Sequence, residues 1–197
     1  MPLGAHKAAS MGVAGVSTEE LVLLATTAVT SATGSVDFTG ISSTYSHYMF
    51  GIYNANPATD TARMAFQMDD DGGSNGYNDF NITSSIGRAI HYENNANAFV
   101  AVNTAFDASS TAFANLGEGT ANDADGHCNS VLHLFNPAST VYAKHFICRA
   151  LEHSDADGSI DFLVGGYINT TTALNAIRFK FTSGNIDTGT FKMWGVK

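Results

Sequence analysis

Residues Ile177–Lys197 read IRFKFTSGNIDTGTFKMWGVK, and this stretch decides the fold class. Apolar and polar residues alternate through IRFKF, a turn containing Gly follows, and the alternation returns through TFKMWGV. A period of two places successive side chains on opposite faces of a β-strand. We therefore predict a final hairpin whose first strand has Ile177, Phe179 and Phe181 on its core face, with Arg178 and Lys180 facing outward.

The returning strand is expected to place Phe191, Met193 and Gly195 on the same core face. Trp194, the only tryptophan, then lies on the opposite face beside Lys192. An outward tryptophan indicates a surface that another chain or a ligand covers. The alternative is a partly exposed indole that lies across neighbouring Thr and Lys side chains, and both interpretations stay open.

Strand patterns of this kind recur along the chain between clusters of Gly, Asn, Asp and Ser. In residues 47–55 the pattern places Tyr48, Phe50 and Ile52 on one face, and in residues 62–68 it does the same for Met64, Phe66 and Met68. Asn-Pro turns, NANPATD and NPAS, separate neighbouring strands. The remaining predicted strands cover residues 21–29, 35–41, 88–92, 98–102, 128–135, 140–151, 160–168, 176–181 and 189–196.

This spacing predicts an all-β fold, an antiparallel two-sheet sandwich with the jelly roll as its expected topology. Residues 18–197 form one sandwich domain, because no linker and no long periodic helix interrupts the pattern. Residues 1–17 are rich in Gly and Ala, lack periodicity, and are expected to be an extended N-terminal arm that contacts a neighbouring subunit. The predicted interface residues are Met1, Leu3, His6, Met11, Val13, Val16, Lys192 and Trp194.

Charge and composition argue against several functional classes. The 197 residues carry 9 Lys and Arg against 18 Asp and Glu, for a net charge of −9. Nucleic-acid binding needs a basic stripe, and attraction to an anionic membrane needs one too, so neither partner is expected. The longest apolar stretch, LVLLA at residues 21–25, is too short to span a bilayer, and no secretory signal is visible, so synthesis in a cytoplasm is expected.

No residue is predicted to be catalytic, and no cofactor is expected. The sequence contains no nucleophile elbow, phosphate-binding Gly loop or zinc-protease motif. Its 18 acidic residues make some carboxylate pair inevitable, but nothing singles one out for glycoside hydrolysis. MDDDGGSNG at residues 68–76 and the two DADG segments are rich in calcium-type oxygen ligands, yet Asp-Gly turns explain them equally well. We therefore predict no bound metal.

Two hypotheses depend on the register of the strands that flank the NPAS turn, residues 136–139. If these strands pair about position 138, His127, His133 and His145 project from one face, where they could bind zinc, although polar or inter-subunit hydrogen bonding is the favoured interpretation. The same register places Cys128 opposite Cys148. A cross-strand disulfide is then conceivable, but free buried thiols are favoured because the protein is made in a reducing compartment.

Two stretches, residues 36–68 and 179–197, resemble a family of small virion proteins of tailed bacteriophages that is common among marine phages. The shared features are an MPLGA-type start (residues 1–5), a Ser-Val-Asp-Phe-Thr strand (35–39), an Asn-x-x-Pro-Ala-Thr-Asp turn (54–60) and a Ser-Gly-Asn-Ile…Gly-Thr-Phe…Gly ending (183–195). The chain departs from the family at Thr61, where Gly is typical, and at Trp194, where Tyr is typical.

The resemblance implies a jelly-roll-like structural protein of the virion, made in the host bacterial cytoplasm. It implies a homo-oligomer, with a trimer favoured, that contacts other virion proteins and either decorates the capsid or belongs to the tail or its fibres. The alternative is a receptor- or glycan-binding module at the tail tip. For that role the candidate aromatic residues are Tyr45, Tyr53, Tyr77 and Trp194.

Overall fold

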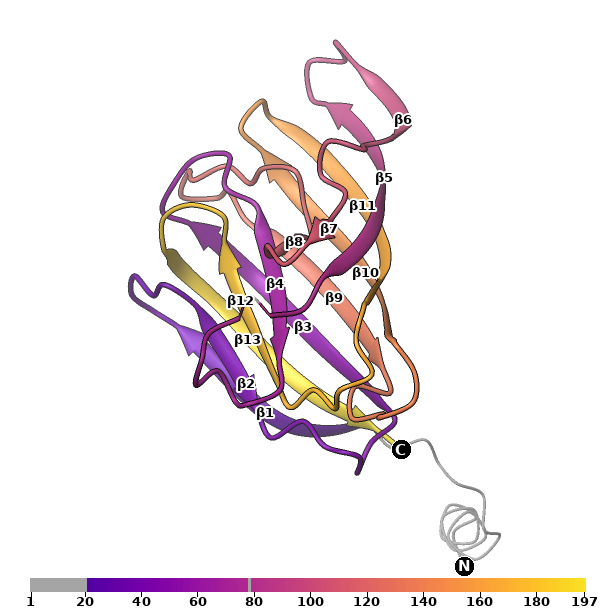
Figure 1. The fold of residues 1–197 in the computed structure, drawn as a ribbon. Helices are drawn as coiled ribbons and strands as arrows, with labels where there is room; N and C mark the ends of the chain where they lie inside the picture. The colour runs from indigo at the N-terminus through magenta and orange to yellow at the C-terminus, as the bar shows by residue number, and fades with distance from the viewer. Residues whose placement is uncertain (1–20, 78) are drawn as a thin grey trace, which may run out of the picture.

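The computed structural model describes residues 21–77 and 79–197, and every helix or strand in this part of the chain is a β-strand (Figure 1). The arm predicted over residues 1–17, with its interface residues Met1, Leu3, His6, Met11, Val13 and Val16, lies outside the described residues. No helix that is long and apolar enough to cross a membrane occurs in the described part of the chain.

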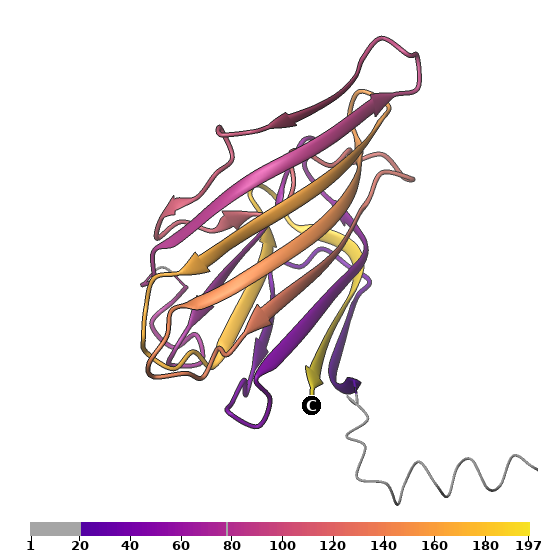
Figure 2. The ribbon, with the colours of Figure 1, turned by 90° about the vertical axis from the view of Figure 1, so that its right-hand side faces the viewer.

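The strands form two antiparallel sheets. The larger sheet contains, in spatial order, β1 (Leu21–Val29), β13 (Ile186–Val196), β3 (His47–Pro57), β9 (Cys128–Phe135), β10 (Lys144–Ser154), β11 (Gly158–Ile168), β5 (Ile82–Tyr92) and β6 (Ala98–Val102), and β7 (Ser109–Ser110) also pairs with β5. The smaller sheet contains β2 (Val36–Thr39), β12 (Ala176–Phe181), β4 (Met64–Asp69) and β8 (Ala114–Asn115). Figure 2 shows the long strands of the larger sheet side by side with a pronounced twist.

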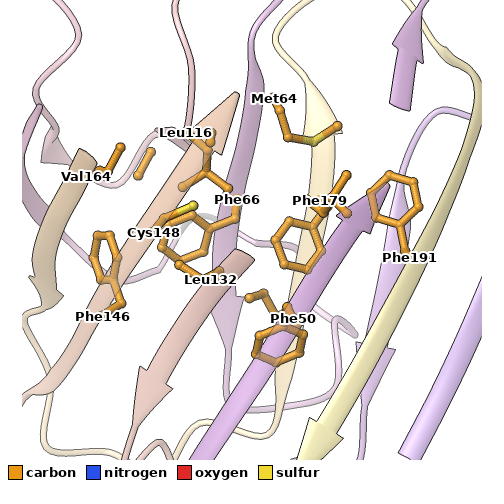
Figure 3. Close-up of a cluster of buried hydrophobic side chains, with 14 of the residues drawn as sticks. Phe50, Met64, Phe66, Leu116, Leu132, Phe146, Cys148, Val164, Phe179 and Phe191 are labelled. Atoms are coloured by element: carbon orange, nitrogen blue, oxygen red, sulfur yellow. The ribbon is translucent and has the colours of Figure 1, made fainter. Parts of the chain in front are cut away.

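The core lies between the two sheets, and the aromatic residues at its centre come from both of them (Figure 3). Phe179 of β12 is fully buried, with its ring centroid 5.7 Å from that of Phe50 on β3 and 6.2 Å from that of Phe191 on β13. Phe66 on β4 packs edge-on against Phe146 of β10 at 4.9 Å. These contacts join the sheets by burial of large apolar side chains.

The outer face of β4 in the smaller sheet is covered by the segment just before β5 and by the chain that connects β6 to β9. Gln67 on β4 is fully buried and donates hydrogen bonds to the carbonyls of Phe80 and Thr111 at 3.1 and 2.9 Å. Lys180 on β12 lies over the ring of Phe113 at 4.4 Å. β4 is therefore covered on both faces, and all six of its residues are buried, including the polar Gln67 and Asp69.

The predicted two-sheet sandwich is confirmed, and every predicted strand overlaps an observed one. The strand predicted over residues 88–92 is longer, Ile82–Tyr92, and the one predicted over 140–151 is shifted to Lys144–Ser154. Residues 128–135 and 176–181 are strands with the predicted bounds. The predicted NPAS turn is present, with Asn136 at a φ of 49° and a hydrogen bond of 3.0 Å from Ser139 N to its carbonyl. The jelly-roll topology is not confirmed by sheets of nine and four strands, and the two-residue strands β7 and β8 were not predicted.

The prediction of a final hairpin is wrong, because β12 and β13 do not pair. β12 lies between β2 and β4 in the smaller sheet, whereas β13 lies between β1 and β3 in the larger one. Phe179 and Phe191 are both inward as predicted, but they face each other across the core. The turn with Gly184 at a φ of 67° therefore carries the chain from one sheet to the other. An alternating strand needs one buried face. A hairpin within one sheet and a position in the opposite sheet both provide it, so the alternation is compatible with either arrangement.

Candidate binding face of the larger sheet

The outer face of the larger sheet carries an unusual number of exposed apolar side chains. Along β10 the alternation is strict, with Phe146, Cys148 and Ala150 inward and Ile147 and Leu151 outward. The large exposed apolar residues of this face are Leu21, Leu23, Tyr53, Val100, Val102, Ile147, Leu151, Leu163 and Tyr167. Extended apolar surface of this kind is typical of sites that bind another molecule.

Strand register arranges these side chains in rows across the sheet. Leu163 on β11 pairs with Arg149 on β10 and with Gly87 on β5, and Gly87 pairs with Val102 on β6. Leu163 is 64% exposed, because a neighbouring Gly has no side chain to cover it. Exposed apolar side chains therefore extend from β11 to the edge strand β6, and the Arg149–Asp161 ion pair lies between them and Leu151 on β10.

Trp194 and Lys192, the predicted interface residues at the C-terminal end, lie on this outer face and are half-buried. The Trp194 ring meets that of Tyr53 edge-on, with centroids 6.5 Å apart and planes at 90°. Lys192 Nζ lies 6.0 Å from the centroid of Tyr53. The outward orientation of Trp194 is confirmed, and the indole packs against an aromatic neighbour.

Tyr53 lies flat against the sheet because its neighbour is Gly51. A Cβ atom added to Gly51 would lie 2.5 Å from Tyr53 Oη and 2.7 Å from Cε2, so the ring occupies the space that a side chain would fill. The opposite face of the ring points away from the sheet, and Tyr53 is 36% exposed. This arrangement creates an aromatic platform, here defined as Tyr53 and Trp194 over Gly51.

Two adjoining hollows lie beside the aromatic platform. The first, of about 430 Å³, is lined by Tyr53, Val131 and Arg149, and it shares Asn129 and Leu151 with the second, of about 400 Å³. Arg149 forms a bidentate ion pair with Asp161, with Nε–Oδ1 at 3.0 Å and Nη2–Oδ2 at 2.7 Å. The hollows together offer apolar walls with a few fixed polar groups, as ligand sites do.

The second hollow is lined by three histidines, His91, His127 and His153, of which sequence reasoning had considered only His127. Ser159 pairs with His153 on one side and with His91 on the other, and His153 N donates to the His127 carbonyl at 3.2 Å. A pattern search could not find this row, because its members come from four different parts of the chain.

The predicted register about position 138 is wrong. His133 pairs with Ile147, which centres the β9–β10 ladder on residue 140, because residues 136–143 form a longer connection than the NPAS turn alone. Lys144 secures this connection by donating from Nζ to the carbonyls of Ser139 and Tyr142 at 2.6 and 2.8 Å.

His133 and His145 lie on the same outer face, as predicted, but the three histidines do not converge on one site. His127 lines the second hollow, His145 packs near Tyr167 with ring centroids 6.1 Å apart, and His133 Nδ1 lies 2.9 Å from Nε2 of His47. Burial lowers the pKa of His133. The hypothesis of a zinc site formed by these three residues is therefore not supported.

The corrected register also separates the two cysteines. Cys128 pairs with Glu152, and Cys148 pairs with Leu132. Both cysteines are free and buried, as the favoured interpretation predicted. Burial raises the pKa of both thiols, that of Cys148 to about 12, so neither forms the reactive thiolate at neutral pH.

Glu152 is a buried carboxylic acid that sequence reasoning missed. It points inward from β10, where its carboxyl oxygens accept hydrogen bonds from Glu118 N at 2.9 Å, Gly119 N at 3.2 Å and Thr120 Oγ1 at 3.3 Å. Burial raises its pKa to about 7, although these hydrogen bonds act in the opposite direction. Nothing in the local sequence marks Glu152, because its partners lie more than thirty residues earlier in the chain.

Of the four aromatic residues predicted for glycan binding, only Tyr53 and Trp194 reach the outer face. Tyr77 is buried beneath Arg178, whose Cζ lies 4.4 Å from the ring centroid. Tyr45 packs against the core, where its ring fills the space beside Gly195. The structure therefore reduces the four candidates to one touching pair.

Comparison with protein-family models, with curated proteins and with solved structures gives no significant match for this chain.

Proposed function

We propose that this chain is a non-enzymatic structural subunit of a bacteriophage particle and that it assembles through the outer face of its larger sheet. The observation that carries the proposal is the exposed apolar surface that Ile147, Leu151, Leu163, Val100 and Val102 form around the Arg149–Asp161 ion pair. In the smaller sheet β4 has its outer face covered by other segments of the chain, whereas the larger sheet leaves apolar side chains in water. A stable partner would remove this surface from solvent.

The partner that we favour is a second copy of the same chain, in a trimer or another closed homo-oligomer. Homo-oligomer interfaces are more apolar than ordinary surface, and the centre of this face has apolar residues with few charges. Its one strong charge pair, Arg149 with Asp161, is internally satisfied and would not be left unpaired on burial. The family resemblance of residues 36–68 and 179–197 supports a place in the virion, on the capsid or in the tail.

Leu163→Lys tests the assembly face, and Val141→Lys is its matched control. The two residues are 64% and 66% exposed, but Val141 lies in the β9–β10 connection, outside the apolar rows. We expect Leu163→Lys to weaken self-association about tenfold or more, because a buried unpaired charge is costly at an interface. Light scattering of the purified variants measures the change, and Val141→Lys is expected to retain the wild-type mass.

A wild-type protein that stays monomeric, or an equal response of the two variants, would contradict assembly through this face. Quantitative mass spectrometry of purified particles then gives the copy number. A high copy number indicates a capsid-decorating subunit, and a low one indicates a tail or fibre component. Absence of the chain from the particles would contradict the virion role itself.

A second function, glycan binding at a tail tip, is favoured by the aromatic platform. A flat tyrosine ring with one open face can stack on the apolar face of a sugar ring, and the adjoining hollow offers Asn129 and Arg149 for hydrogen bonds to hydroxyl groups. The two functions share Leu151 and Arg149, but Tyr53 on β3 and Leu163 on β11 each belong to one of them and allow separate tests.

Tyr53→Ala tests glycan binding, with Tyr142→Ala as the matched control, since Tyr142 is 69% exposed but lies in the β9–β10 connection. We expect Tyr53→Ala to weaken binding to a host surface polysaccharide about tenfold to thirtyfold, because an aromatic anchor contributes about 2 kcal/mol. Isothermal titration with polysaccharides chosen from a glycan array measures it. An array without any bound glycan, or equal losses for the two variants, would rule out this function.

A further inference from the structure

Four aspartates lie at the end of β4 and in the loop that leads to β5, and one of them, Asp71, uses both carboxylate oxygens to hold the loop. Asp71 Oδ1 accepts a hydrogen bond of 2.7 Å from Ser74 N, and its Oδ2 accepts one from Asn75 Nδ2. Asn175, just before β12, fixes the same loop by accepting from Gly72 N at 2.9 Å and donating to the Asp70 carbonyl at 2.6 Å. The loop is therefore held in shape from two sides.

The other three aspartates converge. Asp69, Asp70 and Asp79 each place a carboxylate oxygen within 4.8 Å of the others, and they are the one such group of ligand atoms among residues 21–77 and 79–197. The four ion pairs found in this part of the chain involve none of the three. The nearby Arg178 is already bound to Asp37 through both of its carboxylate oxygens, at 2.7 and 2.6 Å.

Asp69 provides the observation that points to a ligand. It is fully buried, and its Oδ2 accepts hydrogen bonds from Asp71 N and Gly73 N at 3.2 and 2.5 Å. Its Oδ1 is also buried but has no hydrogen-bond partner among the described residues. A buried carboxylate oxygen without a partner is costly, and an unfilled ligand position explains why this one is kept.

We propose that Asp69, Asp70 and Asp79 bind one calcium ion, with Asp69 Oδ1 as the buried ligand. The available donor atoms are all oxygens, so the group lacks the nitrogen and sulfur ligands that zinc prefers and fits a hard cation. Calcium takes six to eight oxygens in flexible geometry, so water on the exposed side of Asp79 and loop carbonyls can complete the shell. Magnesium requires a tighter octahedral set than residues spread over this loop provide.

The ion would connect two layers of the sandwich. Asp69 is the last residue of β4 in the smaller sheet, whereas Asp79 lies shortly before β5 of the larger sheet. Calcium binding is therefore expected to stabilise the folded chain by mass action.

Thermal unfolding of the full chain tests the site after treatment with a chelator, with calcium or magnesium then added at equal ionic strength. We expect millimolar calcium to raise Tm by several degrees and magnesium to raise it much less. Asp79→Asn is the principal variant because Asp79 is exposed, so its loss leaves folding intact, and it should weaken calcium binding about tenfold or more in isothermal titration. Asp155→Asn, in an exposed Asp-Gly turn, is the control and should bind calcium like the wild type.

The absence of a calcium-dependent rise in Tm for the wild type would overturn the proposal. Equal responses to calcium and magnesium, or an unchanged calcium affinity of Asp79→Asn, would do so as well, because either result indicates general screening of acidic surface. Asp69→Asn gives an independent check, since a more stable, calcium-insensitive variant is expected once the buried carboxylate is neutral.

Discussion

Phe179→Ala is expected to lower the free energy of unfolding by about 3–5 kcal/mol, the range observed when a buried aromatic residue is truncated. Phe179 is fully buried, and its ring lies 5.7–6.4 Å, centroid to centroid, from four other phenylalanines. Two of these, Phe50 and Phe191, belong to the opposite sheet, so the cavity would form where the sheets meet (Figure 3). Urea denaturation measures the loss.

Two further variants establish that the loss comes from packing. Phe179→Leu keeps most of the volume and is expected to cost less than about 1.5 kcal/mol. Tyr142→Ala truncates an aromatic residue that is 69% exposed and is expected to change stability by less than about 0.5 kcal/mol. Similar losses for Phe179→Ala and Tyr142→Ala would mean that the described core is incorrect.

Glu152 is expected to make the fold less stable as the pH rises from about 4.5 to about 7. Its pKa is raised from 4.5 to about 7 in the folded chain, so within this window the folded state retains a proton that the unfolded state has lost. Stability falls with pH wherever the folded state binds more protons, and the full penalty, reached above the folded pKa, is about 3 kcal/mol.

Glu152→Gln removes this penalty while keeping the hydrogen bonds. The amide oxygen can accept from Glu118 N and Gly119 N, and the amide nitrogen can donate to Thr120 Oγ1. Urea denaturation is expected to show equal stability of variant and wild type at about pH 4 and a more stable variant, by up to about 3 kcal/mol, at about pH 8.

Glu152→Ala separates charge from hydrogen bonding. It removes the charge too, but it leaves two backbone N–H groups without acceptors, so we expect it to be less stable than Glu152→Gln at every pH. If Glu152→Gln follows the wild type across the whole pH range, the carboxyl is not held in its neutral form by burial.

The sequence alone was sufficient to find eleven of the thirteen strands that the structure describes, at least in part, and the inner faces of the longer ones. Period-two alternation placed Phe50, Phe66, Phe179 and Phe191 in the core and Trp194 on the outer face, and all five positions are confirmed. These features are local, because alternation within one strand determines which side chains can be buried together.

The same argument could not predict which strands pair or in which register. The observed pairing of β9 with β10 is shifted by four residues from the predicted one, and an even shift leaves every side chain on the same face. The prediction therefore placed Cys128 and Cys148 correctly in the core but paired them wrongly. The pairing of β12 failed for a related reason, since its inner face is satisfied in a hairpin with β13 and equally by packing across the core from it.

The sequence singled out Asp69 and Asp70 as calcium-type ligands and Tyr53 and Trp194 as candidate aromatic residues, but only the tertiary structure decided which residues meet at each site. Three contacts could not be predicted from the local sequence of either partner. They are the row of His91, His153 and His127, the hydrogen bonds that Glu152 accepts, and the approach of Asp69 to Asp79. The sequence therefore determined which face of each strand is buried, because burial follows a local period. Only the tertiary structure determined which strands and side chains meet, because pairing depends on contacts between distant residues that the period leaves open.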